Sequence, residues 1–240
     1  HDLLLSLKRA CDSNEVVLAG GHTEITHGID RPIAVGFMVG TLSQHGFVSA
    51  RDARPGDDVL LSKAIPLEAT ALLAREFAAM LDLDPGTLER ARNLIYDPGI
   101  SVRREALIAL STGGVTAMHD PTEGGVATGL YEMACASGRA FVIDGDMIPV
   151  VEPAADILPV FSIDPMGALA SGSLIVCCRP EATRSILDGW EKSGIPGTRI
   201  GTVTDGGESV IVRRGQPSPL RPFPADEITK AFGARRDRRQ

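Results

Sequence analysis

The chain has 240 residues, of which 43% are hydrophobic and 23% are charged, as in ordinary globular proteins. This composition excludes a disordered chain. The formal net charge is −7 and aromatic residues make up only 4%, so we expect no binding to nucleic acid, which favours basic and aromatic surfaces. No apolar run approaches the roughly 20 residues that a membrane helix needs, so we expect no membrane insertion.

The chain has four cysteines, and their spacing does not suggest a metal site: Cys11, Cys135, Cys177 and Cys178. Cys177 and Cys178 are neighbours, so on a strand they would point to opposite faces. No secretory signal is visible in the sequence. We therefore expect a cytoplasmic protein with reduced thiols.

The first elements are predicted upstream of residue 52. Leu3, Leu4 and Leu7 recur at helical spacing, which predicts a helix over 2–13. The chain starts inside this pattern and without Met, so we expect further residues before it in the natural protein. Strands are expected over 15–19 and 33–41. The turn at residues 54–57 suggests a domain boundary near residue 52.

Beyond that boundary, helices and strands are mixed without a strict βαβ rhythm, which indicates an α+β fold. Strands are expected over 58–63, 115–118, 141–143, 173–178, 199–203 and 209–213, the last two forming a hairpin across 205–207. Helices are expected over 68–81, from 84–85 onward, and over 101–110, 122–136, 152–160, 180–192 and 225–232.

The first segment suited to chemistry is Gly20-Gly21-His22-Thr23-Glu24, directly after a predicted strand. Two glycines allow a ligand to approach the backbone closely. The Glu24 carboxylate suits Mg²⁺, which prefers oxygen ligands, and His22 suits a phosphate or substrate. The alternative is a tight turn with a capping Thr23 and two surface side chains.

The second such segment runs from His119 to Gly125, between a predicted strand and a predicted helix. A helix N-terminus offers free N–H groups to an anion, and glycines in its first turn give the anion room. Asp120 suits a cation that bridges phosphates, and Thr122 can donate to an oxygen. The structural alternative is that Asp120 or Thr122 is an N-cap, which is compatible with binding.

Several common enzyme motifs are absent. The order His-Thr-Glu-Ile-Thr-His at residues 22–27 is not the H-E-x-x-H zinc motif. The sequence has neither a G-x-x-x-x-G-K-S/T phosphate loop nor a strand-linked G-x-G-x-x-G. Residues 171–173 lack the G-x-S-x-G elbow of serine hydrolases. Phosphate chemistry would therefore need a different kind of site.

Five segments in order carry a resemblance to a known superfamily, and together they are more specific than any one alone. The ordered set is similar to the aminoimidazole ribonucleotide synthetase-related (PurM-like) superfamily, and most similar to the hydrogenase-maturation protein HypE and to other AIR synthase-related proteins. The matching segments are Gly20–Glu24, Arg54–Asp58, Asp97–Val102, Asp120–Gly125, and Asp164–Gly167 followed by Ala170–Gly172.

The resemblance implies a two-domain PurM-like α+β architecture and a homodimer. It implies that residues 1–51 are the C-terminal part of an N-terminal ATP-binding domain whose first half is missing. Residues 52–215 would be the AIR synthase C-terminal-like domain, and residues 216–240 a tail with a short helix. The implied cofactors are ATP and Mg²⁺. The implied reaction is ATP-dependent phosphorylation of an amide-type oxygen or similar nucleophile on an unknown acceptor.

The resemblance also implies roles for individual residues. Asp120 and His22 are the implied catalytic residues, and Glu24 and Asp120 the implied metal ligands. Several relatives have a carboxylate where His22 stands, so the metal-ligand role moves to Glu24. The implied cofactor-binding residues are Gly20, Gly21, Thr23, Thr122, Gly124 and Gly125.

Two departures from the family pattern leave a second function open. The glycine-rich and aspartate-rich segment that opens the family's first domain is not in these 240 residues, and no Cys follows Cys178, whereas HypE closes with an acceptor Cys. Synthesis on a tail Cys is therefore not expected. The alternative to an enzyme is a non-catalytic nucleotide-binding or dimerisation module.

Overall fold

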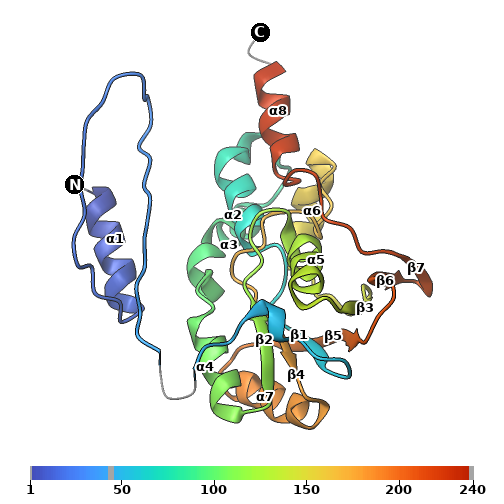
Figure 1. The fold of residues 1–240 in the computed structure, drawn as a ribbon. Helices are drawn as coiled ribbons and strands as arrows, with labels where there is room; N and C mark the ends of the chain where they lie inside the picture. Colours follow the sequence, from blue (N-terminus) through green and yellow to red (C-terminus); the bar gives the residue numbers. More distant parts are fainter. Residues whose placement is uncertain (1, 43–45, 238–240) are drawn as a thin grey trace. The chain divides into compact units, whose positions relative to one another are not determined.

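The structure is a computed structural model that describes residues 2–42 and 46–237 (Figure 1). The chain divides into two compact units, His1–Phe47 and Val48–Gln240. No helix among the described residues is long and apolar enough to cross a membrane.

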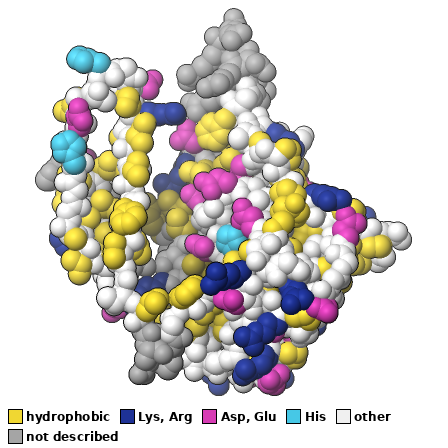
Figure 2. Space-filling view, in the orientation of Figure 1, with side chains coloured by type: hydrophobic (Ala, Val, Ile, Leu, Met, Phe, Trp, Pro, Cys, Tyr) yellow, Lys and Arg dark blue, Asp and Glu magenta, His cyan; other side chains and the backbone are white. Residues whose placement is uncertain are grey.

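The first unit contains one helix and extended chain. Helix α1 (Asp2–Ser13) forms as predicted, with a 2.6 Å ion pair between Lys8 and Asp12 on successive turns. The strands predicted over 15–19 and 33–41 are wrong: no strand forms over these residues, Glu15 lies in the turn that follows α1, and nothing in 2–42 is buried. A β pattern forms a strand only where a second strand pairs with it. Hydrophobic side chains along the extended segment are exposed (Figure 2), among them Ile33, Val35, Phe37, Met38 and Val39.

The second unit is built on a seven-stranded sheet in the order β2-β4-β1-β5-β3-β6-β7. All neighbours in the sheet are antiparallel except β3 and β6, which are parallel. The mixed helix and sheet content confirms the α+β fold class. The strands are β1 (Asp58–Ser62), β2 (Val115–His119), β3 (Ala140–Asp144), β4 (Ile175–Cys178), β5 (Gly197–Thr204), β6 (Val210–Arg213) and β7 (Gln216–Pro219).

The predicted hairpin between residues 199–203 and 209–213 is wrong. Strand β5 already pairs with β1 on one side and β3 on the other, so β6 joins the far side of β3. The turn at Asp205-Gly206-Gly207 therefore crosses the end of β3, where Arg139 forms an ion pair with Asp205. Strand β6 finds its antiparallel partner in β7, an element that the sequence pattern missed.

Helices cover both faces of the sheet (Figure 1). Val59 and Leu61 of β1 pack with helix α5 (Gly125–Ser137), whereas Leu60 between them packs with α4 (Arg103–Thr112) and α7 (Pro180–Lys192). Cys177 and Cys178 likewise belong to opposite clusters, which confirms the prediction that they point to opposite faces. Because both faces are covered, β1 and β4 are buried along their whole length.

A separate helical cluster stands at one end of the sheet. It contains α2 (Leu67–Glu76), α3 (Pro85–Asn93), α6 (Ala154–Ile157) and α8 (Thr229–Asp237). At its centre the Phe77 ring contacts the rings of Phe161 and Phe232, with centroids 5.2 and 5.1 Å away. The cluster brings the C-terminal helix against the rest of the second unit.

Local signals set several helix ends. Asp84 caps α3 by accepting from the amides of Gly86 and Thr87, as its position before Pro85 predicted. Helix α2 ends at Glu76, earlier than predicted, and a 3₁₀ turn over Ala78–Met80 follows. Ser101 does not cap α4, which begins at Arg103 after Val102.

The segment Arg54–Asp58 has a structural role. The Asp57 carboxylate accepts from the Arg54 amide at 2.8 Å and from the Thr116 hydroxyl of β2 at 2.6 Å. The Asp58 carboxylate accepts from Arg199 of β5 and Thr183 of α7, both at 2.7 Å. These two neighbouring carboxylates therefore join the turn, two further strands and a helix.

A buried ion pair links the end of β1 to α4. Lys63 Nζ lies 2.6 Å from Glu105 Oε1, and the two side chains are only 5% and 2% exposed. The same ammonium donates to the carbonyls of Gly99 and Ser101 at 3.0 and 2.9 Å. This arrangement surrounds the lysine with oxygen atoms and fixes the 99–101 segment against the sheet.

We predict that Glu105→Gln lowers the free energy of unfolding by about 3 kcal/mol, because it leaves a buried lysine without its counter-charge. Urea unfolding measures the change. The matched control is Asp188→Asn, which breaks the exposed pair between Arg184 and Asp188 and should change stability by less than about 0.5 kcal/mol. Equal losses in the two variants would contradict this reading of the buried pair.

Candidate functional site

The segment between β2 and α5 is shaped by two glycines. Strand β2 ends at His119 and α5 begins at Gly125, three residues later than predicted. Gly124 and Gly125 both have positive φ, +76° and +68°. A Cβ on Gly125 would lie 2.3 Å from the carbonyl oxygen of Met166, so only glycine fits between α5 and the 164–169 loop.

Neither Asp120 nor Thr122 is the N-cap of α5, because Gly124 occupies that position. The Thr122 hydroxyl donates to Glu123 Oε2 at 2.8 Å. The Thr122 carbonyl accepts from the amides of Gly125 and Ala170, at 3.1 and 3.2 Å. The loop is thus tied to the helix start and to the neighbouring 170–173 segment, and Asp120 is left for contacts outside the helix.

His119 lies between two carboxylates. Its Nε2 is 2.7 Å from Glu132 Oε2 of α5, and its Nδ1 is 3.8 Å from Asp120 Oδ1. Asp120 and Glu132 together outweigh partial burial and raise the pKa of His119 above its ordinary value. The same contact with His119 holds the pKa of Asp120 below its ordinary value. Asp120 is therefore an ionised carboxylate whose side chain is 71% exposed.

The start of α5 is occupied by a carboxylate of the chain itself. The Gly124 amide donates to Asp226 Oδ2 at 2.8 Å. Asp226 Oδ1 accepts from the amides of Leu169 and Ile228, at 3.3 and 2.9 Å. The amide that the sequence predicts to face a ligand anion thus faces an anion of the C-terminal segment in this structure.

The other predicted site residues belong to the first unit. Gly20, Gly21 and Thr23 are exposed on extended chain, as are His22 and Glu24. His22 Nε2 and Glu24 Oε2 are 3.9 Å apart, and both side chains are largely exposed. The structure thus groups Asp120, Thr122, Gly124 and Gly125 in one unit and residues 20–24 in the other.

The described residues hold no group of three or more His, Cys, Asp and Glu side chains that could bind a metal. Magnesium at a nucleotide site has a lighter requirement: it needs one or two carboxylates, with phosphates and waters completing its shell. The ionised, exposed carboxylate of Asp120 meets that requirement. The residues around Asp120 therefore fit a metal that arrives together with phosphates.

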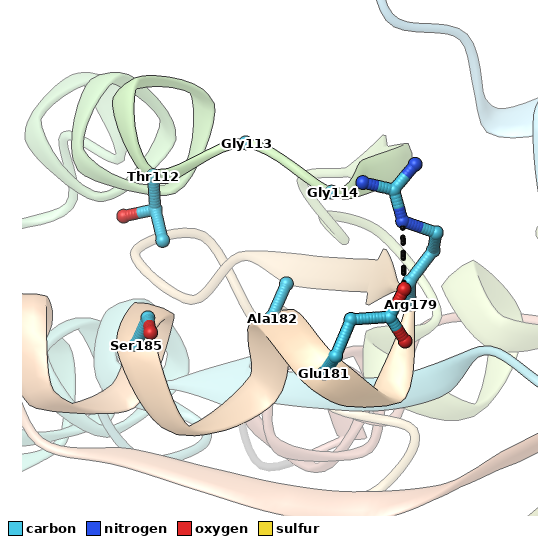
Figure 3. A pocket seen from close by; sticks show the side chains of 7 residues that line it. All are labelled: Thr112, Gly113, Gly114, Arg179, Glu181, Ala182 and Ser185. Carbon is cyan, nitrogen blue, oxygen red and sulfur yellow. Dashed lines mark ion pairs between the residues drawn. The ribbon is translucent and has the colours of Figure 1, made fainter.

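A surface hollow of about 230 Å³ lies between the end of α4 and the start of α7 (Figure 3). Arg179 and Glu181 form an ion pair at its rim, with 3.2 Å between Nε and Oε1. The hollow lies at the opposite end of β2 from His119, because Val115 pairs with Cys178 while His119 pairs with Ile175. It contains none of the predicted site residues. Its lining is Thr112, Gly113, Gly114, Arg179, Glu181, Ala182 and Ser185.

Sequence reasoning missed two partners of the 119–125 loop. Glu132 is 13 residues from His119, and only the packing of α5 beside β2 brings the two together. Asp226 is 102 residues from Gly124. The predicted helix over 225–232 contained the acidic pair Asp226-Glu227, whereas α8 begins only at Thr229, and nothing in the pattern indicated which amides the Asp226 carboxylate meets.

Three comparisons place the chain among known proteins. The carbamoyl dehydratase HypE of Cupriavidus necator is 28% identical over 184 residues, which cover 73% of this chain and 48% of that protein. The crystal structure of Escherichia coli HypE matches with a TM-score of 0.65 at 20% identity, covering 77% of this chain and 55% of that one. A structure of HypE in complex with ATP matches with a TM-score of 0.58 at 21% identity, covering 78% and 56%.

These matches confirm the PurM-like fold, and the chain spans about half the length of the relatives it matches. A family model described as "AIR synthase related protein, C-terminal domain" matches residues 54–213. That range is two thirds of the chain and contains the sheet from β1 to β6, together with the loops at 119–125 and 164–169. The chain therefore belongs to the AIR synthase related protein family.

Proposed function

We propose that the chain is part of a HypE-like enzyme that uses ATP to phosphorylate an amide-type oxygen, or a similar nucleophile, on an acceptor. The similarity to a carbamoyl dehydratase and to an ATP-bound HypE structure supports the use of ATP. The single structural observation that carries the proposal is the ionised, exposed Asp120 beside the glycine-rich start of α5.

The proposed chemistry explains why ATP is needed. An amide-type oxygen is a poor leaving group, and a carbamoyl group has such an oxygen. Transfer of the γ-phosphoryl group to that oxygen breaks the bond to ADP and turns the oxygen into a good leaving group. In phosphoryl transfer the protein mainly positions the reactants and stabilises charge.

Asp120 would hold Mg²⁺ on the ATP phosphates, and the ion would supply positive charge to the transferring phosphoryl group. Thr122 would donate to a phosphate oxygen, and the backbone at Gly124 and Gly125 would approach the phosphates closely. For the first unit we propose, from the resemblance alone, that Gly20, Gly21 and Thr23 contact nucleotide, that Glu24 is a metal ligand and that His22 contacts substrate. The enzyme would work as a homodimer, with a small molecule or a protein as acceptor.

The second candidate function is a non-catalytic nucleotide-binding or interaction module. The observation that favours it is Asp226, whose carboxylate already accepts the hydrogen bond of the Gly124 amide. Such a module would bind Mg²⁺·ATP and release no ADP. Product analysis after incubation with Mg²⁺·ATP, in which only the enzyme forms ADP, separates the two functions.

We predict that Mg²⁺·ATP at about 100 times its Kd stabilises the chain by roughly 2.7 kcal/mol, which raises Tm by about 5–11 °C for a chain of this size. Asp120→Asn should abolish most of that shift, because the amide cannot replace the carboxylate as a metal ligand. Without nucleotide the variant should melt within a few degrees of the wild type, since the Asp120 side chain is exposed.

The matched control is Glu181→Gln, which removes an exposed carboxylate from the hollow of Figure 3. This variant should keep the full nucleotide shift. A shift that survives in Asp120→Asn but is lost in Glu181→Gln would move the nucleotide to that hollow and contradict the proposed site.

We predict that His119 titrates above its ordinary pKa of about 6.5, and that Glu132→Gln lowers its pKa by removing one of the two flanking charges. Because the folded-state pKa is the raised one, the stabilisation is fully present below the unfolded pKa and is lost as the pH rises through the folded pKa. An NMR titration of the imidazole C–H signals measures the pKa, and unfolding at several pH values measures the stabilisation.

The control for this titration is Glu123→Gln. Glu123 lies in the same loop, but its carboxylate accepts from Thr122. The His119 pKa should change little in this variant. An ordinary or lowered pKa for His119 in the wild type would show that burial outweighs the two carboxylates.

A further inference from the structure

The C-terminal segment of the second unit crosses the loops that border α5. We call residues 220–232 the strap. Four of its residues are buried against the unit, namely Leu220, Glu227, Ile228 and Ala231. The family match ends at residue 213, so the strap lies outside the matched domain but packs against it. Figure 1 shows this segment in red, running from β7 past α5 into α8.

The first anchor of the strap is Asp226. Its carboxylate accepts from three backbone amides that belong to three segments: Gly124 at the start of α5, Leu169 of the 164–169 loop, and Ile228 of the strap. Backbone N–H groups that converge on one anion are a general device for holding carboxylates and phosphates. Here the anion is covalently part of the chain.

The second and third anchors are Glu227 and Phe223, which hold the strap to the 164–169 loop. Glu227 Oε2 accepts from the Asp164 amide at 2.9 Å, and the Glu227 amide donates to the Gly167 carbonyl at 3.0 Å. The Phe223 ring lies so close to Gly167 that a Cβ there would be 2.5 Å from the ring. The Phe223 amide donates to the Thr128 hydroxyl of α5 at 3.2 Å.

These contacts account for the motif Asp164-Pro165-Met166-Gly167, which the proposed function left unused. Asp164 and Gly167 hydrogen-bond to Glu227 of the strap, and Gly167 also leaves room for Phe223. Met166 contributes its carbonyl, which accepts from the Ala127 amide at 3.0 Å and so ties the loop to α5. One face of the loop binds the strap while its other face binds the helix.

We propose that the strap is an autoinhibitory contact. The Asp226 carboxylate occupies the Gly124 amide and thereby competes with a phosphate group of the nucleotide for that amide. The inference rests on the proposed function, because it concerns the same amide. A phosphate oxygen at the Gly124 amide would lie next to the Asp226 carboxylate, and the two negative charges repel each other, so nucleotide binding displaces Asp226. The covalent link gives Asp226 a high effective concentration at Gly124, and the apparent affinity for nucleotide falls by the fraction of chain whose strap is docked.

Hydrogen exchange on the full 240-residue chain, with and without saturating Mg²⁺·ATP, tests the displacement directly. The strap amides of Glu227 and Ile228 are protected by the docked contacts. The proposal predicts that the nucleotide speeds their exchange roughly tenfold while the Gly124 amide stays protected, because a phosphate oxygen replaces Asp226 there. Unchanged or slower exchange at Glu227 and Ile228 with nucleotide bound would overturn the proposal.

Two variants test the affinity by calorimetric titration with Mg²⁺·ATP. Asp226→Asn removes the competing charge, and Phe223→Ala loosens the strap without any change of charge. Both should tighten binding, by roughly five- to tenfold if most of the wild-type chain has its strap docked. The matched control is Asp205→Asn, which removes an exposed carboxylate paired with Arg139 and should leave the affinity unchanged.

The outcomes separate the strap from the proposed function. Tighter binding in Phe223→Ala as well as in Asp226→Asn supports the strap, and so does binding that appears only in these two variants. Tighter binding in Asp226→Asn alone would show that only the local charge affects the affinity, and it would overturn the autoinhibitory role of the strap. Wild-type binding that neither variant improves overturns the strap but leaves the proposed function standing. No binding by the wild type or by any variant overturns both.

Discussion

The second unit depends on carboxylates that accept hydrogen bonds from the backbone of its loops. Loop amides have no helix or strand partner, and a buried amide without an acceptor is costly. The Asp57 carboxylate accepts from an amide of the turn before β1, and the Asp226 carboxylate accepts from the amide at the start of α5. The Glu227 carboxylate accepts from an amide of the 164–169 loop. These side chains hold in place the loops where the candidate site lies.

The sheet itself leaves little room for chemistry. Both faces are covered by helices, and β1 and β4 are buried throughout. Polar groups for binding therefore gather where strands end and helices begin. At the end of β2 the chain places His119, Asp120 and the two glycines of α5 within one short segment. Here an ionised carboxylate, a histidine with a raised pKa and two glycines with positive φ lie close together in the chain.

Much of the second unit could be predicted from the sequence, because its signals are local. Asp84 before Pro85 indicated the start of α3, and the apolar run at 59–61 indicated β1. The hairpin at residues 205–207 failed because the order of strands depends on which edges of β5 are already paired. The strands predicted in the first unit failed for a related reason: a strand pattern needs a partner strand, and residues 2–42 do not provide one.

The candidate site divides in the same way. Asp120, Thr122, Gly124 and Gly125 were identified from their position between a strand and a helix, and the structure places them in that connection. The contacts of Glu132 and Asp226 with this connection were not predictable, since each depends on elements that only the fold brings together. Sequence spacing therefore located the loop, whereas the charges that act on it came from the tertiary structure.

Paramagnetic broadening of the backbone amide NMR signals by Mn²⁺·ATP would test the central claim most directly. Mn²⁺ takes the place of Mg²⁺ and broadens the signals of nearby amides. We predict that the amides of residues 119, 120 and 122–125 are broadened first and that Asp120→Asn removes the effect. Broadening centred on residues 112–114, 179 and 181–185, around the hollow at the other end of β2, would contradict the proposed site.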